Sequence, residues 1–143
     1  MLGQCRLSRF GSFSPKVFNR LSCANCYNLL VYVSPDTKLQ FNVTYEGYLV
    51  SDDLGFDPTD PNDILGIKSS MQLSEFDRWR ACCVSAERCC SKVMVKSPTN
   101  SSGHCTSIWD GWSCHKRTLA GQISKVKCPY YVLGDTCNTV FDY

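Results

Sequence analysis

Eleven of the 143 residues are cysteines, and their number and positions constrain the fold more than any other feature of the sequence. Three of them lie within residues 1–68, and eight lie within residues 82–137. Such a density is close to that of scaffolds held together by disulfides, which form in oxidising compartments outside the cytosol. We therefore expect a secreted or extracellular chain whose small core depends on cross-links.

One long helix is predicted in the second half of the chain. Ser69-Ser-Met-Gln72 has the Ser-x-x-Gln form of a capping box, and Ser97-Pro98 is expected to end the helix. Between them an apolar stripe repeats at spacings of three and four, as on one face of an amphipathic helix. The stripe consists of Phe76, Trp79, Cys83, Ala86, Cys90 and Val93.

Four cysteines lie on this expected helix in two adjacent pairs. Positions six to eight apart are separated by roughly 9–12 Å along a helix axis, whereas the two Cα atoms of a disulfide lie within about 7 Å. The four are therefore expected to bond outward, with cysteines of the following strands as partners and the connectivity left open. The helix cysteines are Cys82, Cys83, Cys89 and Cys90, and the strand cysteines are Cys105, Cys114, Cys128 and Cys137.

Short strands and tight turns are expected after the helix. Trp109-Asp-Gly-Trp112 places Asp-Gly between two aromatic residues, which is a strong hairpin signal. Ala120-Gly121 marks another turn, and apolar residues alternate with Lys and Pro over residues 125–130. The predicted fold is a small, disulfide-rich α+β domain in which one N-terminal helix packs on two short antiparallel hairpins or sheets.

Residues 1–68 show weaker patterns, so we divide the chain near residue 68. The first part is an unassigned N-terminal segment with an acidic linker, and the domain covers residues 69–143. Residues 39–45 alternate like a half-buried strand. Residues 1–50 match no recognisable pattern of a core and are expected to be dispensable for folding of the domain.

An acidic stretch and two asparagines are further features of the sequence. Residues 51–63 contain five Asp, but they lack the alternating ligand positions and closing Glu of an EF-hand, so a solvated linker is favoured over a calcium loop. Asn42 and Asn100 begin sequons for N-glycosylation, which are usable only in a secreted chain.

Several classes of function are disfavoured. A net charge of +2 gives no reason to expect nucleic acid as a partner. No apolar run approaches the roughly 20 residues of a membrane span, and no signal peptide is visible at the start. Cys23-Ala-Asn-Cys26 has the spacing of a zinc knuckle, but a second matched pair is missing. Signatures of hydrolases are also missing. We expect no enzyme activity, no metal and no cofactor.

A cysteine and tryptophan motif carries a family resemblance. Cys105-Thr-Ser-Ile-Trp-Asp-Gly-Trp-Ser-Cys114, followed by Ala120-Gly121 and Cys128-Pro-Tyr-Tyr131, resembles the extracellular hormone-receptor domain of secretin-like (class B) G-protein-coupled receptors. The likeness is closest to calcitonin-receptor-like and invertebrate neuropeptide receptors, and it covers about residues 69–131. The chain departs from the family at His115, where the family has Trp, and at Leu119, where it has Pro.

The resemblance implies a set of structural roles. It implies three disulfides, in which a helix cysteine pairs with Cys114, and Cys105 and Cys128 pair with a fifth and a sixth cysteine. Only Cys137 follows Cys128, so the domain is expected to be truncated at its C-terminal end. The resemblance also implies that Asp110 is a buried structural hub. Candidate residues of a peptide groove are Trp109, Trp112, Tyr130 and Tyr131.

The function implied by the resemblance is that of a peptide-hormone-binding ectodomain at the cell surface. Its ligand would be a peptide hormone or neuropeptide whose amphipathic helix docks in a groove. A G protein would be reached only through a membrane domain outside this chain. The alternative is a secreted disulfide-rich binding protein, such as a decoy or a toxin-like scaffold, without receptor signalling.

Overall fold

The computed structural model describes residues 3–30, 57–96, 103–132 and 140–142. Within these residues the structure has three α-helices, one π-helix and eight strands of two or three residues. The helices are α1 (Pro15–Leu30), α2 (Pro61–Lys68), α3 (Leu73–Arg88) and η1 (Cys89–Met94). The strands are β1 (Cys5–Leu7), β2 (Gly11–Phe13), β3 (His104–Cys105), β4 (Ile108–Trp109), β5 (Cys114–His115), β6 (Thr118–Leu119), β7 (Ile123–Lys125) and β8 (Val140–Asp142).

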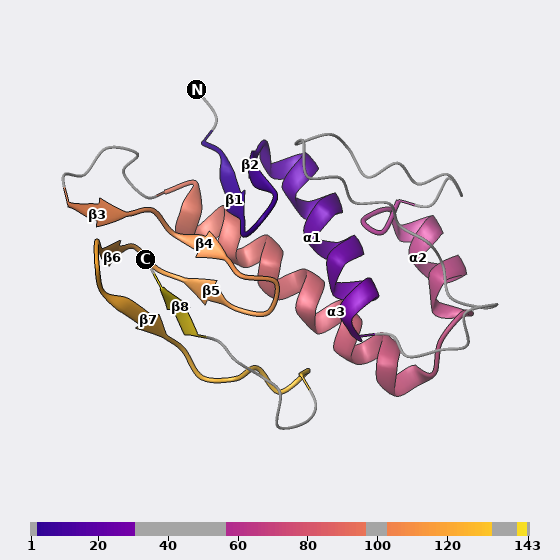
Figure 1. Cartoon of the computed structure of the whole chain (residues 1–143). Coiled ribbons are helices and arrows are strands. Elements are labelled where there is room, and N and C mark those ends of the chain that lie inside the picture. The colour runs from indigo at the N-terminus through magenta and orange to yellow at the C-terminus, as the bar shows by residue number, and fades with distance from the viewer. Residues whose placement is uncertain (1–2, 31–56, 97–102, 133–139, 143) are drawn as a thin grey trace.

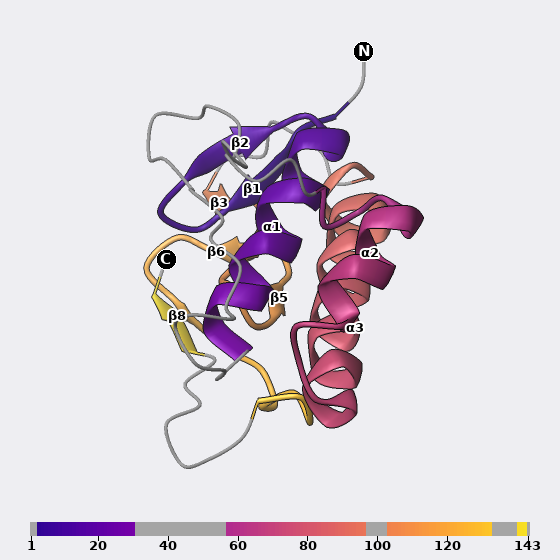
Figure 2. The same ribbon diagram turned by 90° about the vertical axis from the view of Figure 1, so that its right-hand side faces the viewer.

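Helices α1 and α3 lie side by side and form the centre of the molecule (Figures 1 and 2). Helix α1 begins at Pro15. Proline suits the first position of a helix because a backbone N–H there would have no partner within the helix. Its buried face includes Phe18, Leu21 and Tyr27, and the Tyr27 ring meets the Trp79 ring of α3 edge-on at 6.1 Å. The Trp79 indole also donates a 2.9 Å hydrogen bond to the Cys23 carbonyl oxygen. The expectation that residues 1–50 contribute no core is therefore wrong for α1.

The helix predicted in the second half is present, with different ends. It begins after Gln72, whose backbone N–H donates to the Glu75 carboxylate at 3.3 Å, so the capping box lies three residues later than expected. Ser69 instead caps the C-terminus of α2. At Cys89 the helix changes to the wider π form, in which the Val95 N–H bonds the Cys90 carbonyl oxygen at 2.9 Å.

The strands form one four-stranded sheet and two separate pairs. The sheet has the order β2-β1-β4-β5, and β1 runs parallel to β4, so the N-terminal hairpin extends the β4–β5 hairpin. The two pairs are β3–β6 and β7–β8. The predicted class, a small disulfide-rich α+β fold, is confirmed. The structure adds two helices before the predicted one and a parallel pair within the sheet.

All four cysteines of the long helical segment bond outward, as expected. The partners of three of them lie in the N-terminal segment, and the expectation of strand partners is wrong for these three. The pairs are Cys5–Cys90, Cys23–Cys83, Cys26–Cys82 and Cys89–Cys114. Only Cys89–Cys114 joins the helical segment to the strands that follow it. The physical reason is that α1 packs against α3, which accounts for two of these pairs, and that β1 packs against η1, which accounts for Cys5–Cys90.

The other cysteines divide into two kinds. Cys128 is disulfide-bonded, although none of the four pairs above contains it. Cys105 on β3 is a free thiol, contrary to the expectation that it pairs. Every other cysteine of the described residues is in a disulfide, so Cys105 has no available partner among them. The whole chain has eleven cysteines, and an odd number cannot all pair within one chain.

The acidic stretch is partly helical rather than a solvated linker. Its aspartates satisfy local backbone donors: Asp60 caps α2 by accepting from the Asn62 N–H at 2.8 Å, and Asp63 accepts from the Asp57 N–H at 2.9 Å. The Asp57 carboxylate lies 3.5 Å from Nε of Arg20 on α1. Residues 51–56, the expected strand at 39–45, and Asn42, Asn100 and Cys137 lie outside the described residues.

Candidate functional site

A pocket of about 380 Å³ opens between α3, the β4–β5 hairpin and the segment after β7. All four aromatic residues proposed for a peptide groove line it, from two segments about twenty residues apart. The lining residues are Ser85, Trp109, Trp112, Ser113, Cys114, Val126, Lys127, Pro129, Tyr130 and Tyr131. The motif residues of the sequence analysis therefore meet at one place in the fold, and Cys114 anchors that place to the helical segment through Cys89.

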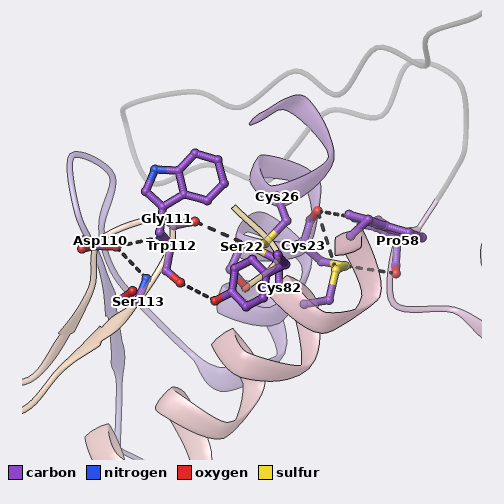
Figure 3. The surroundings of a disulfide bond; sticks show 12 residues. Ser22, Cys23, Cys26, Pro58, Cys82, Asp110, Gly111, Trp112 and Ser113 are labelled. Atoms are coloured by element: carbon purple, nitrogen blue, oxygen red, sulfur yellow. Dashed lines mark hydrogen bonds between the residues drawn. A yellow bond between two sulfur atoms is a disulfide. The ribbon is translucent and has the colours of Figure 1, made fainter. Parts of the chain in front are cut away.

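The turn of the β4–β5 hairpin spans residues 110–113 and depends on Asp110. The hairpin is present as expected, but its loop has four residues rather than the two of an Asp-Gly turn, because Trp109 pairs with Cys114. One oxygen of the Asp110 carboxylate accepts from the Trp112 N–H at 2.8 Å and from the Ser113 N–H at 2.7 Å. Figure 3 shows these two bonds at the turn. Asp110 thereby fixes the backbone that carries Trp112 into the pocket.

Gly111 lets this turn lie directly on α1. Its φ of +106° is in the region that favours glycine, and an added Cβ would lie 3.4 Å from the Asn25 side chain. The Gly111 carbonyl oxygen is 3.9 Å from the Cys82 sulfur, so the Cys26–Cys82 disulfide lies next to the turn (Figure 3). The pocket wall is therefore supported by the N-terminal helix, which the sequence motifs gave no reason to expect.

His115 is a side-chain partner of Asp110, and sequence reasoning missed this role. Its Nε2 lies 2.6 Å from the other carboxylate oxygen, and its Nδ1 lies 2.8 Å from the Ser124 hydroxyl on β7. An ionised carboxylate only accepts, so Nε2 donates to Asp110, and in the neutral ring Nδ1 accepts from Ser124. The imidazole is fully buried. It connects the hairpin to β7 at the position where the receptor domains that the sequence resembles have tryptophan.

The two tyrosines contribute in different ways. The Tyr131 hydroxyl donates to the Trp112 carbonyl oxygen, and the ring is buried, so Tyr131 is a structural wall of the pocket. Burial raises the pKa of Tyr131 to about 12, with a smaller opposing effect of a hydrogen bond with Ser85 and a further rise from the nearby Asp110 charge. Tyr130 packs edge-on against Tyr131 at 5.6 Å and is 80% exposed. Tyr130 is therefore the aromatic side chain most available to a ligand.

The ionisation of Tyr131 gives a direct test of this packing. The folded chain holds the phenol proton up to pH about 12, whereas the unfolded chain releases it near 10. The resulting contribution to stability is complete below pH 10 and is lost between about 10 and 12. After alkylation of Cys105, the difference between the tyrosinate titrations of the wild type and Tyr131→Phe is expected to be one step near 12. A step near 10 would show that Tyr131 is solvated.

The composition of the pocket lining suits an apolar ligand. Most of the lining is aromatic or apolar, and Lys127 is the one lining residue with a formal charge. Two buried polar atoms of the lining, Nε1 of Trp109 and Oγ of Ser113, make no hydrogen bond within the described part of the chain. Sequence reasoning did not propose Ser85, Val126, Lys127 or Pro129 as residues of the groove, and of these only Pro129 lies in a quoted motif, Cys128-Pro-Tyr-Tyr131.

Two kinds of site expected to be absent from the sequence concern the cysteines and the helices of the described residues. No group of three or more His, Cys, Asp or Glu side chains that could hold a metal ion occurs within 3–30, 57–96, 103–132 and 140–142. The sulfur atoms of Cys23 and Cys26, with zinc-knuckle spacing, are both consumed in disulfides. Over the same ranges, no helix combines the length and the apolar character needed to cross a bilayer.

Two known proteins are similar to this chain, and both are named as receptors. The G-protein coupled receptor seb-2 of Caenorhabditis elegans is 26% identical over 170 aligned positions, which cover 97% of this chain and 34% of that receptor. The calcitonin gene-related peptide type 1 receptor of Xenopus tropicalis is 41% identical over 44 residues, which cover 30% of this chain and 9% of that receptor. No family model matches the sequence, and no solved structure matches the fold.

These similarities support a receptor-related extracellular domain of the class B type. The first covers nearly the whole chain, including the N-terminal segment that contributes α1 and three cysteines of the disulfide network. The chain spans about a third of the length of seb-2 and less than a tenth of the Xenopus receptor.

Proposed function

We propose that the chain is the peptide-binding extracellular domain of a class B G-protein-coupled receptor. The observation that carries the proposal is the convergence of Trp109, Trp112, Tyr130 and Tyr131 on one open pocket, in a chain similar to two receptors. A pocket of this size, mostly apolar with few polar groups, suits one or two large side chains of a docking helix.

The supports of the pocket are consistent with a binding role. The Cys89–Cys114 disulfide has the arrangement that the resemblance implies for the helix cysteine and the third cysteine of the family. The Asp110–His115 bond and the Tyr131–Trp112 bond fix both walls before a ligand arrives. Such preorganisation lowers the entropy lost on binding. Tyr130 and the half-buried Trp112 then offer aromatic area to the ligand.

In the full-length receptor, this domain would lie on the extracellular side of the plasma membrane. It would hold one part of a peptide hormone or neuropeptide and present the other part to a membrane domain. Coupling to a G protein would occur through that membrane domain and not through this chain. The cell-surface location is supported by the receptor similarities and by the disulfides, which persist outside the cytosol.

Selection from a displayed library of random linear peptides tests the proposal without a known ligand. The oxidised full chain is expected to enrich peptides with apolar or aromatic residues at helical spacing. Their affinity is expected to fall at least about tenfold for Tyr130→Ala, a residue exposed enough to be removed without unfolding the domain. Leu65→Ala is the matched control, because Leu65 is also exposed but lies on α2, away from the pocket.

Two results would contradict the proposal. One is that the folded chain enriches no peptide. The other is that Tyr130→Ala and Trp112→Ala bind the enriched peptides as well as the wild type does, which would place peptide binding elsewhere on the chain.

A further inference from the structure

We propose that Lys127 makes the pocket selective for peptides that carry an acidic residue next to the side chain that fills it. This inference rests on the proposed peptide-binding function and names the chemical class of ligand that the pocket prefers. It depends on the position of Lys127 and on the charges around the pocket. It also depends on the internal hydrogen bonds that already occupy the Asp110 carboxylate.

Lys127 is an exposed cation on the wall of an otherwise uncharged pocket. The other lining residues are aromatic, aliphatic, hydroxyl-bearing or disulfide-bonded. The residue after Lys127, Cys128, is disulfide-bonded, which restrains the backbone at this point. A restrained backbone limits the range over which the ammonium group can move around the pocket.

The charges on the strand side of the pocket are mostly positive. Between residues 103 and 132 the basic side chains are Lys116, Arg117, Lys125 and Lys127, and the one acidic side chain is Asp110. The Asp110 carboxylate accepts from two backbone N–H groups and from His115. It is therefore already bonded and is not a partner for Lys127. A ligand approaching this side meets a positive potential.

The helix side of the pocket adds further positive charge. On α3, Arg78 lies about 20° and Arg88 about 60° around the helix axis from Ser85, the α3 residue that lines the pocket. The acidic residues of α3 are farther round, with Glu75 and Asp77 at about 80° and Glu87 at about 160° from Ser85. Both sides of the pocket therefore favour an anionic group on the ligand.

The size of the expected effect follows from the exposure of the pair. A solvent-exposed ion pair contributes little to affinity, whereas a pair partly shielded by the ligand and by the Tyr130 ring contributes more. We expect removal of the positive charge to weaken binding about three- to tenfold. Reversal of the charge is expected to weaken binding further, because it adds repulsion between like charges.

Peptides enriched by the oxidised wild-type chain are the probes for the test. Each is synthesised with its acidic residue, with the uncharged amide in its place, and with Lys in its place. Their affinities are then measured for the wild type, Lys127→Met and Lys127→Glu. Lys127→Met keeps most of the side-chain volume without the charge. Lys125→Glu is the matched control, because it makes the same charge change on an exposed residue that does not line the pocket.

The wild type is expected to bind the acidic peptide more tightly than the amide and Lys peptides. Lys127→Met should lose this preference, and Lys127→Glu should prefer the Lys peptide. Lys125→Glu should keep the preference. The inference is overturned if the enriched peptides bind through the pocket without any charge preference, or if Lys125→Glu has the same effect as Lys127→Glu. In both cases peptide binding itself would stand. If no peptide is enriched at all, the proposed function fails together with the inference.

Discussion

A chain that begins at Asp57 is expected not to fold, although the sequence alone indicates that the N-terminal segment is dispensable. Removing residues 1–56 deletes Cys5, Cys23 and Cys26 and so breaks three disulfides. Loss of one native disulfide from a small secreted domain typically costs about 2–5 kcal/mol. The deletion also exposes the α1-facing side of α3, where Trp79 is fully buried. Three such losses together cost about 6–15 kcal/mol, which is as large as the whole stability of a typical domain, roughly 5–15 kcal/mol.

Circular dichroism and thermal melting of the shortened chain measure this loss. The matched control is the full chain with a protease site placed between residues 31 and 56 and then cut, since its two pieces remain joined by the same three disulfides. The cut chain should keep its helix signal until a reductant is added. A cooperative melt of the chain from Asp57 at the temperature of the full chain would show that α1 is an accessory element.

Asp110→Ala is expected to lower the free energy of unfolding by about 3 kcal/mol or more. The substitution leaves three donors without an acceptor, namely the N–H groups of Trp112 and Ser113 and the buried Nε2 of His115. Each unpaired buried group costs roughly 1–3 kcal/mol. For a domain of this size the melting temperature should fall by roughly 10 °C.

Asp110→Asn is the matched control for this substitution. The amide oxygen can still accept from the two backbone N–H groups of the turn, so Asp110→Asn should retain part of the stability that Asp110→Ala loses. A double-mutant cycle with His115→Phe then isolates the coupling between the carboxylate and the imidazole. A melt of Asp110→Ala that overlays the wild type would mean that these three bonds contribute nothing to the fold.

Local sequence patterns predicted the elements that have strong local signals. The stripe from Phe76 to Cys90 identified the long helix, and the distance between its cysteine pairs showed that they must bond outward. The Trp-Asp-Gly-Trp motif identified the hairpin and four aromatic residues that meet at one pocket. These features depend on helix geometry or on turn chemistry within a few residues, which a sequence displays directly.

The features that sequence reasoning missed depend on contacts between distant segments. Helix α1 contains Asn, Ser and Cys, which are poor helix formers, and packing against α3 stabilises it. Without α1 and β1, the partners of Cys82, Cys83 and Cys90 could not be identified. Lys127 likewise belongs to no motif, and only the fold places it at the pocket.

Disulfide mapping by mass spectrometry tests the central claim, which is that the long helix is bonded on one side to the N-terminal segment and on the other to the pocket hairpin. After free thiols are blocked, a tryptic digest without reductant should join peptide 81–88 to peptide 21–38. The digest should also join peptide 89–92 to both 1–6 and 97–116, with the blocking label on Cys105. Peptide 81–88 bonded instead to 97–116, or Cys105 found in a disulfide, would contradict the account.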